Sequence, residues 1–138
     1  MLRSGCILST PQPEDGVRIS VMSRHTLEDG KTPDERITPD QYDQWMPELA
    51  PPPKLVGAWY CRKLGERTPE NFDTQYRPRY IEYLAEKTDL VKNLGELAIS
   101  TTITVLCIEP TEESSMCHRT ILLEYCQSLV PGLEIEKG

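Results

Sequence analysis

Hydrophobic residues recur along the chain in two different patterns, and each pattern predicts one kind of element. Residues 17–22 alternate and are rich in β-branched side chains, which predicts a strand. Residues 101–108 form a continuous β-branched run, typical of a strand buried on both faces. Residues 88–98 and 116–129 repeat apolar side chains at helical spacing. Residues 133–136 are predicted to form a last, edge strand.

Prolines divide the middle of the chain into short elements. A threonine followed by a proline indicates a helix start at Thr38-Pro39 and again at Thr68-Pro69. We expect the first of these helices to end near Pro47, and Pro78 to kink or split the second. Residues 50–53 are interpreted as a stiff, extended spacer that is followed by a helical turn.

The order of these elements predicts the fold class. Strands separated by helices favour parallel pairing with right-handed crossovers. We therefore predict a single α/β domain over residues 1–138, a small three-layer sandwich with a central, mostly parallel sheet flanked by helices. Residues 1–16 would form an N-terminal strand or loop region, and residues 133–138 a C-terminal edge strand or tail.

Composition and charge exclude several classes of protein. No segment approaches the ~20 apolar residues of a membrane helix, so we expect no membrane partner. The net charge of -7 argues against a nucleic-acid surface. The clustered basic residues are therefore interpreted as a solvated face. They are Lys54, Arg62, Lys63, Arg67, Arg77 and Arg79.

The cysteines indicate a reducing compartment. There are five, an odd number at irregular spacing, and no Cys-x-x-Cys pair occurs among them. Residues 1–10 lack the long apolar segment of a signal peptide. We therefore expect a cytoplasmic protein with free thiols at Cys6, Cys61, Cys107, Cys117 and Cys126.

One group of polar residues is expected to form a site. In an open parallel sheet, ligands bind beyond the carboxyl ends of the strands. The strand at 17–22 leads to Arg24 and His25, and the strand at 101–108 leads to Glu109 and then to the helix start at 117–119. If the two strands are neighbours, these groups converge. A helix start suits a small anionic or phosphate-containing ligand. The predicted ligand-binding residues are Arg24, His25, Cys107 and Arg119.

The same group contains candidates for catalysis. A thiol at a helix start has a lowered pKa, which makes Cys117 a candidate nucleophile or redox thiol. His118 could act as its base, and His25 is an equally plausible base. Glu109 could orient Arg119 or His118, or act as a general acid or base. Pro110 follows Glu109 directly and favours an extended conformation there.

Two alternatives remain open at this point. The chain could be a non-enzymatic binding or interaction domain whose cysteines are structural, because no complete catalytic motif is present. Alternatively, Cys107, Cys117 and His118 could form a metal site together with Cys61 or His25. The sequence has no dinucleotide fingerprint and no P-loop, so we expect no cofactor. It does not decide between an enzyme and a binding domain.

Three segments resemble the DUF488 family of uncharacterised bacterial and archaeal proteins. Residues 42–51 are similar to its Trp-x-x-Glu-Leu-Ala-Pro block, and residues 72–84 to a helix with spaced aromatic residues. Residues 103–109 with 117–119 resemble its Cys-x-Glu and Cys-His-Arg signature. The resemblance implies a compact α/β domain and supplies no established activity. Many members have an aspartate in the first strand followed by an arginine, whereas residues 20–24 contain no carboxylate.

Overall fold

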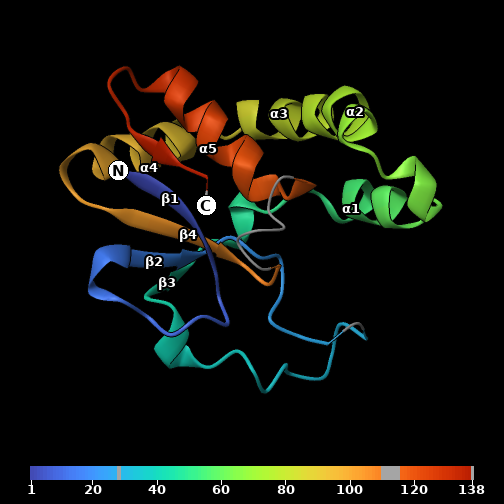
Figure 1. The fold of residues 1–138 in the computed structure, drawn as a ribbon, viewed down its shortest axis with the longest axis horizontal. Coiled ribbons are helices and arrows are strands. Elements are labelled where there is room, and N and C mark those ends of the chain that lie inside the picture. The colour runs from blue at the N-terminus through green and yellow to red at the C-terminus, as the bar shows by residue number, and fades with distance from the viewer. Residues whose placement is uncertain (28, 110–115, 138) are drawn as a thin grey trace.

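A five-stranded parallel sheet forms the centre of the molecule (Figure 1). The computed structural model describes residues 1–27, 29–109 and 116–137. The strand order is β3-β2-β4-β1-β5, and every neighbouring pair runs in parallel. The predicted α/β class with a parallel sheet is therefore confirmed. The strands are β1 (Leu2–Cys6), β2 (Val17–Ser20), β3 (Gln44–Trp45), β4 (Ile103–Cys107) and β5 (Ile135–Glu136).

Strand β4 lies in the middle of the sheet and aligns its neighbours. Cys6 at the end of β1 pairs with Cys107, and Ser20 at the end of β2 pairs with Leu106. Because all three strands run in parallel, their carboxyl ends meet at one edge of the sheet. Strands β2 and β4 are paired, as the predicted convergence of the polar residues after them requires.

The helices that follow residue 52 occur in the order predicted from the sequence. They are α1 (Pro53–Tyr60), α2 (Pro69–Asn71), α3 (Arg77–Ala85), α4 (Thr88–Ser100) and α5 (His118–Leu129). Thr68 caps α2 by accepting a hydrogen bond from the Asn71 amide at 3.1 Å. Pro78 lies in the first turn of α3, after a short π-helical segment at Phe72–Tyr76. The regular α-helix is interrupted there, but the backbone at Phe72, Tyr76 and Arg77 remains helical, so the chain is not split into separate helices. No helix in the described part of the chain is long and apolar enough to span a membrane.

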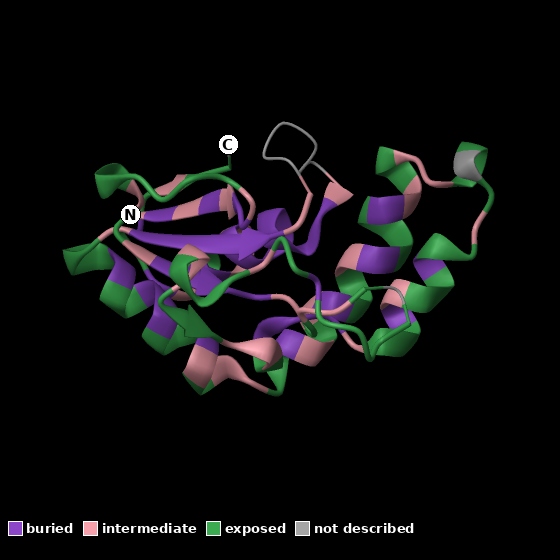
Figure 2. Ribbon diagram, turned by 90° about the horizontal axis from the view of Figure 1, so that it is seen from below, coloured by how far each residue is buried: buried purple, intermediate pink, exposed green. Residues whose placement is uncertain are grey.

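The two faces of the sheet are covered differently. Apolar strand residues on one face, such as Ile19 and Val105, join a single cluster with apolar residues of α1, α3, α4 and α5. On the other face, loops supply polar contacts to the strands. The Thr104 hydroxyl donates to the Asp15 carbonyl at 2.7 Å, and the Arg18 guanidinium pairs with the Asp15 carboxylate. Figure 2 shows the buried centre of the sheet in purple, with exposed segments around it.

The prediction of a helix from Thr38 to Pro47 is wrong. The helix start is real, because the Thr38 amide donates to Gln41 Oε1 at 2.6 Å, but only one 3-10 turn follows. Strand β3 then begins where the helix was expected to continue. Asp43 exchanges two hydrogen bonds with the backbone of Arg18, each 2.8 Å long. This pairing with β2 is non-local, so the local capping signal could not reveal it.

Gly16 provides a test of how tightly the first loop is packed against the sheet. Its φ is +63°, and a Cβ atom at this position would lie 2.0 Å from the Thr102 carbonyl oxygen. We expect Gly16→Ala to lower the free energy of unfolding by about 2 kcal/mol or more in urea denaturation.

Gly57 is the matched control. It lies inside α1, and a Cβ atom there would meet nothing within 4 Å. Gly57→Ala should raise the free energy of unfolding by up to about 1 kcal/mol, because alanine loses less backbone entropy in a helix. Equal effects of the two substitutions would contradict the described packing of Gly16.

Candidate functional site

A cavity of about 710 Å³ opens beyond the carboxyl ends of β2 and β4. This volume is within the range of small-molecule sites. Its floor combines the end of β4 with the start of α5, and the opposite wall is aromatic, with Trp59 and Tyr60 from α1. Among the residues singled out from the sequence, five line this cavity. They are Arg24, Cys107, Glu109, Cys117 and His118.

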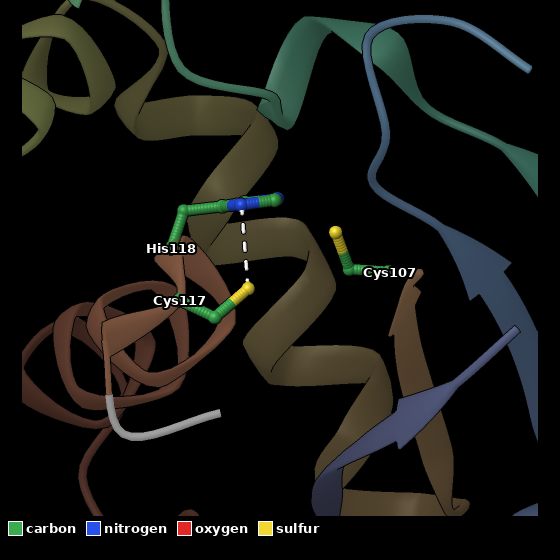
Figure 3. Close-up of side chains that lie close together, drawn as sticks. All are labelled: Cys107, Cys117 and His118. Atoms are coloured by element: carbon green, nitrogen blue, oxygen red, sulfur yellow. Dashed lines mark hydrogen bonds between the residues drawn. The ribbon is translucent and has the colours of Figure 1, made fainter. Parts of the chain in front are cut away.

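Cys117 is the residue that caps the start of α5. Its backbone is extended, and the helix begins at the next residue. Its Sγ lies 3.3 Å from Arg119 Nε, which donates to it, and 3.6 Å from His118 Nδ1 (Figure 3). A hydrogen bond from the Cys107 thiol and the charges of His118 and Arg119 outweigh burial, and together they hold the pKa of Cys117 well below its usual value.

Cys107 has the opposite electrostatic character, although it faces the same cavity. The hydrogen bond to Cys117, together with burial, raises the pKa of the Cys107 thiol well above its usual value. The charge of Glu109 adds to this effect. The pKa values of the two cysteines are therefore shifted in opposite directions, which favours the thiol form of Cys107 and the thiolate form of Cys117.

His118 is oriented by the end of the sheet. Its Nε2 donates to the Val21 carbonyl at 3.0 Å, which turns Nδ1 toward the sulfur of Cys117. Burial opposes a charge on this ring, but the neighbouring Cys117 and the bond to Val21 raise the pKa of His118 overall. A protonated His118 would donate from both ring nitrogens, which matches both contacts.

Glu109 extends the site toward the aromatic wall. One carboxylate oxygen lies 3.7 Å from Cys117 Sγ, and the other accepts a hydrogen bond from the Tyr60 hydroxyl at 3.3 Å. Partial burial and the charge of Glu109 raise the pKa of Tyr60 to about 12, so its hydroxyl stays protonated as a donor. Pro110, which was expected to shape this position, lies outside the described residues.

Arg119 lies behind the floor of the cavity and has no exposed surface. Its guanidinium donates to the Gly5 carbonyl, to the Glu109 carbonyl at 3.0 Å and to Cys117 Sγ. It does not line the cavity. The geometry therefore makes Arg119 a positioning residue that joins β1, β4 and α5.

His25 and Arg24 are adjacent in sequence but lie in different surroundings. His25 Nε2 is 2.7 Å from Ser20 Oγ, and its ring stacks on Trp45 at 4.2 Å between centroids. His25 does not line the cavity, whereas Arg24 does, on the loop that follows β2 and close to Asp29. The convergence of strand ends therefore brings Arg24 to the cavity and leaves His25 outside it.

Several lining residues were not identified from the sequence. The ion pair of Asp34 and Arg36, 2.8 Å long, lines the cavity, and so do the aromatic rings of Trp59, Tyr60 and Tyr76. The sequence feature that could have identified the aromatic wall is the adjacent pair Trp59 and Tyr60 on a predicted helical turn. Their position in the cavity lining, with Tyr60 against Glu109, depends on how α1 packs, which local spacing does not reveal.

A metal ion would find three donors on the cavity floor. The ligand atoms of Cys107, Cys117 and His118 lie within 4.8 Å of one another. Thiolate and imidazole are donors that zinc favours. Neither Cys61, which is exposed beyond the end of α1, nor His25 belongs to this group. The larger metal sites considered from the sequence are therefore not assembled in the described residues.

The comparison with known proteins agrees with these motifs. The model of DUF488-N3a, described as the active DUF488-N3 subclade, matches residues 4–129. The chain belongs to the DUF488 family. No curated protein and no solved structure matches it. In this DUF488 protein, Cys107, Glu109, Cys117 and His118 of the Cys-x-Glu and Cys-His-Arg segments line the cavity, and Arg119 lies behind them.

The buried guanidinium of Arg119 gives a direct test of how the floor is held together. We expect Arg119→Lys to lower the free energy of unfolding by about 3 kcal/mol, because one ammonium group cannot reach the three acceptors. Arg79→Lys on the exposed side of α3 is the matched control and should change stability by less than about 0.5 kcal/mol. Chemical denaturation measures both, and a neutral Arg119→Lys would contradict this role.

Proposed function

We propose that the cavity of this DUF488 protein binds a small anionic or phosphate-containing ligand and that Cys117 reacts with it as a nucleophile. The observation that carries this proposal is the position of Cys117. Its sulfur faces a ligand-sized cavity and contacts donors from Arg119 and His118. A thiolate is the reactive form of cysteine, and these contacts stabilise that form.

Two positive features of the cavity, the start of α5 and Arg24, support an anionic ligand, although Asp29, Asp34 and Glu109 also line the cavity. The start of α5, a helix of 12 residues, presents unpaired N–H groups and the positive end of its dipole. Arg24 on the facing loop adds a guanidinium, a group suited to carboxylate or phosphate. The aromatic wall at Trp59 and Tyr60 would pack against an apolar part of the same ligand.

Glu109 is placed to move protons in the reaction. The attack of Cys117 Sγ on an electrophilic atom forms a new bond to sulfur and expels a leaving group. A carboxyl group 3.7 Å from that sulfur can supply or accept the proton that the leaving group or an attacking water requires. The hydroxyl of Tyr60 orients Glu109 through its hydrogen bond.

The pH dependence of alkylation tests the nucleophile. The test uses a Cys61→Ser background, which removes the exposed thiol. The rate at which iodoacetamide modifies Cys117 should reach its plateau, and so have its pH midpoint, well below pH 8.5, the usual pKa of a thiol. His118→Gln should move the midpoint toward higher pH, because the neighbouring positive charge is lost. Peptide mass spectrometry measures the rate at each cysteine. A midpoint at or above 8.5 in the parent protein would refute an activated Cys117.

Protection by an anion tests the ligand class. At constant ionic strength, inorganic phosphate should slow the alkylation of Cys117 more than chloride does. Arg24→Gln should raise the phosphate concentration needed by roughly tenfold, because one charge-assisted hydrogen bond is lost. Arg79→Gln removes a charge that does not line the cavity and should leave protection unchanged. Equal protection by phosphate and chloride would contradict an anion site.

A further inference from the structure

We propose that Cys107 and Cys117 form a redox-active pair that reduces small anionic disulfides, with Cys117 as the attacking thiol and Cys107 as the resolving thiol. This inference rests on the proposed nucleophilic role of Cys117 and adds a second reacting residue and a substrate class. It gives Cys107 a covalent role in addition to its hydrogen bond to Cys117.

The geometry selects this pair from the five cysteines. The sulfur atoms of Cys107 and Cys117 lie within 4.8 Å of each other and both face the cavity (Figure 3). All five cysteines are within the described residues and are free thiols. Cys6 and Cys126 do not line the cavity and donate instead to the Ile108 and Val91 carbonyls, and Cys61 is exposed beyond α1.

The two thiols are also unequal in the way that sequential exchange requires. Cys117 Sγ accepts a hydrogen bond from Arg119 Nε at 3.3 Å and lies 3.6 Å from His118 Nδ1, so Cys117 is placed to attack first, and Cys107 lies beside it in the cavity lining. When Cys117 becomes bonded to a second sulfur, it loses its negative charge. The strongest cause that keeps Cys107 protonated then disappears. Glu109, which is within hydrogen-bonding reach of the Cys107 thiol, can accept the proton.

The reaction is balanced in two steps. In the first, the Cys117 thiolate attacks one sulfur of a disulfide RSSR, the S–S bond breaks, and RS⁻ leaves from a Cys117–S–S–R mixed disulfide. In the second, Glu109 takes the proton of Cys107, and the Cys107 thiolate attacks the sulfur of Cys117. The second RS⁻ leaves and takes the proton from Glu109. Two electrons pass from the cysteine pair to the substrate, and a cellular dithiol would restore the pair.

The surroundings of the pair indicate which disulfides would fit. The cavity of about 710 Å³ can admit one half of a low-molecular-weight disulfide. Arg24 and the start of α5 would bind carboxylate groups on that half. Glutathione disulfide, an anionic peptide disulfide, has this chemistry and serves as the probe.

A single-turnover experiment tests the pair. The Cys61→Ser protein is treated with a chelator, analysed for metal and mixed with glutathione disulfide. We expect an internal Cys107–Cys117 disulfide, seen by peptide mapping as the loss of two hydrogen atoms, and release of both glutathione halves. Cys107→Ser should stop at glutathione bound to Cys117, and Cys117→Ser should form neither product. Cys6→Ser is the matched control, because Cys6 lies beside Cys107 in the sheet, and it should behave like the parent.

Glu109→Gln separates the two steps without removing a thiol. It should slow resolution of the mixed disulfide by roughly a hundredfold and slow its formation much less, because only the second step requires Glu109 to take the proton of Cys107. A cooperative urea unfolding transition in Cys107→Ser shows that this variant is folded. A stable mixed disulfide in the parent overturns the resolving role of Cys107 and leaves the nucleophile proposal intact. Failure of Cys117 to react with both iodoacetamide and glutathione disulfide overturns both. One tightly bound zinc per chain that resists the chelator and blocks exchange overturns the redox pair.

Discussion

The buried guanidinium of Arg119 is the constraint on which the rest of the site depends. A charged group without exposed surface is costly unless its donors are satisfied, and Arg119 satisfies them at three separate parts of the chain. The Gly5 carbonyl fixes it to β1, the Glu109 carbonyl to the end of β4, and Cys117 Sγ to the start of α5. These contacts determine how closely the strand ends approach the helix. They also place a positive charge next to Cys117, so the fold itself favours a thiolate at that position.

The sequence predicted the parts of this arrangement that depend on local pattern and on topology. The β-branched run at residues 101–108 became the central strand β4, and the apolar spacing after Met116 became α5. Parallel pairing then brought the two strand ends together, as expected. Strand β1 was assigned only to a mixed strand and loop region, because polar and small residues such as Arg3 and Gly5 obscure its pattern. Its central position depends on pairing with residues about one hundred positions away.

Side-chain direction was harder to predict than the position of the elements. Arg24 and His25 were both expected to bind the ligand, yet the chain turns between them after β2. His25 is held by Ser20 and stacked on Trp45, and this stacking exists only because β3 lies beside β2. The contact of Tyr60 with Glu109 likewise requires α1 to pack across the cavity. Such contacts arise from tertiary packing and leave no fixed spacing in the sequence.

The cavity floor links the protonation of its residues to the stability of the fold. The pKa of Cys117 is lowered in the folded protein, so its contribution to stability is present above the unfolded pKa and is lost as the pH falls through the folded value. The pKa of His118 is raised, so its contribution is present below the unfolded pKa and is lost as the pH rises through the folded value. The charged pair of Cys117 and His118 therefore exists between the two folded pKa values.

Any reaction that neutralises the sulfur of Cys117 removes the partner of both His118 and Arg119. The negative charge on Cys117 therefore affects both the reactivity of the cavity and, through its contact with Arg119, the packing of α5 on the sheet.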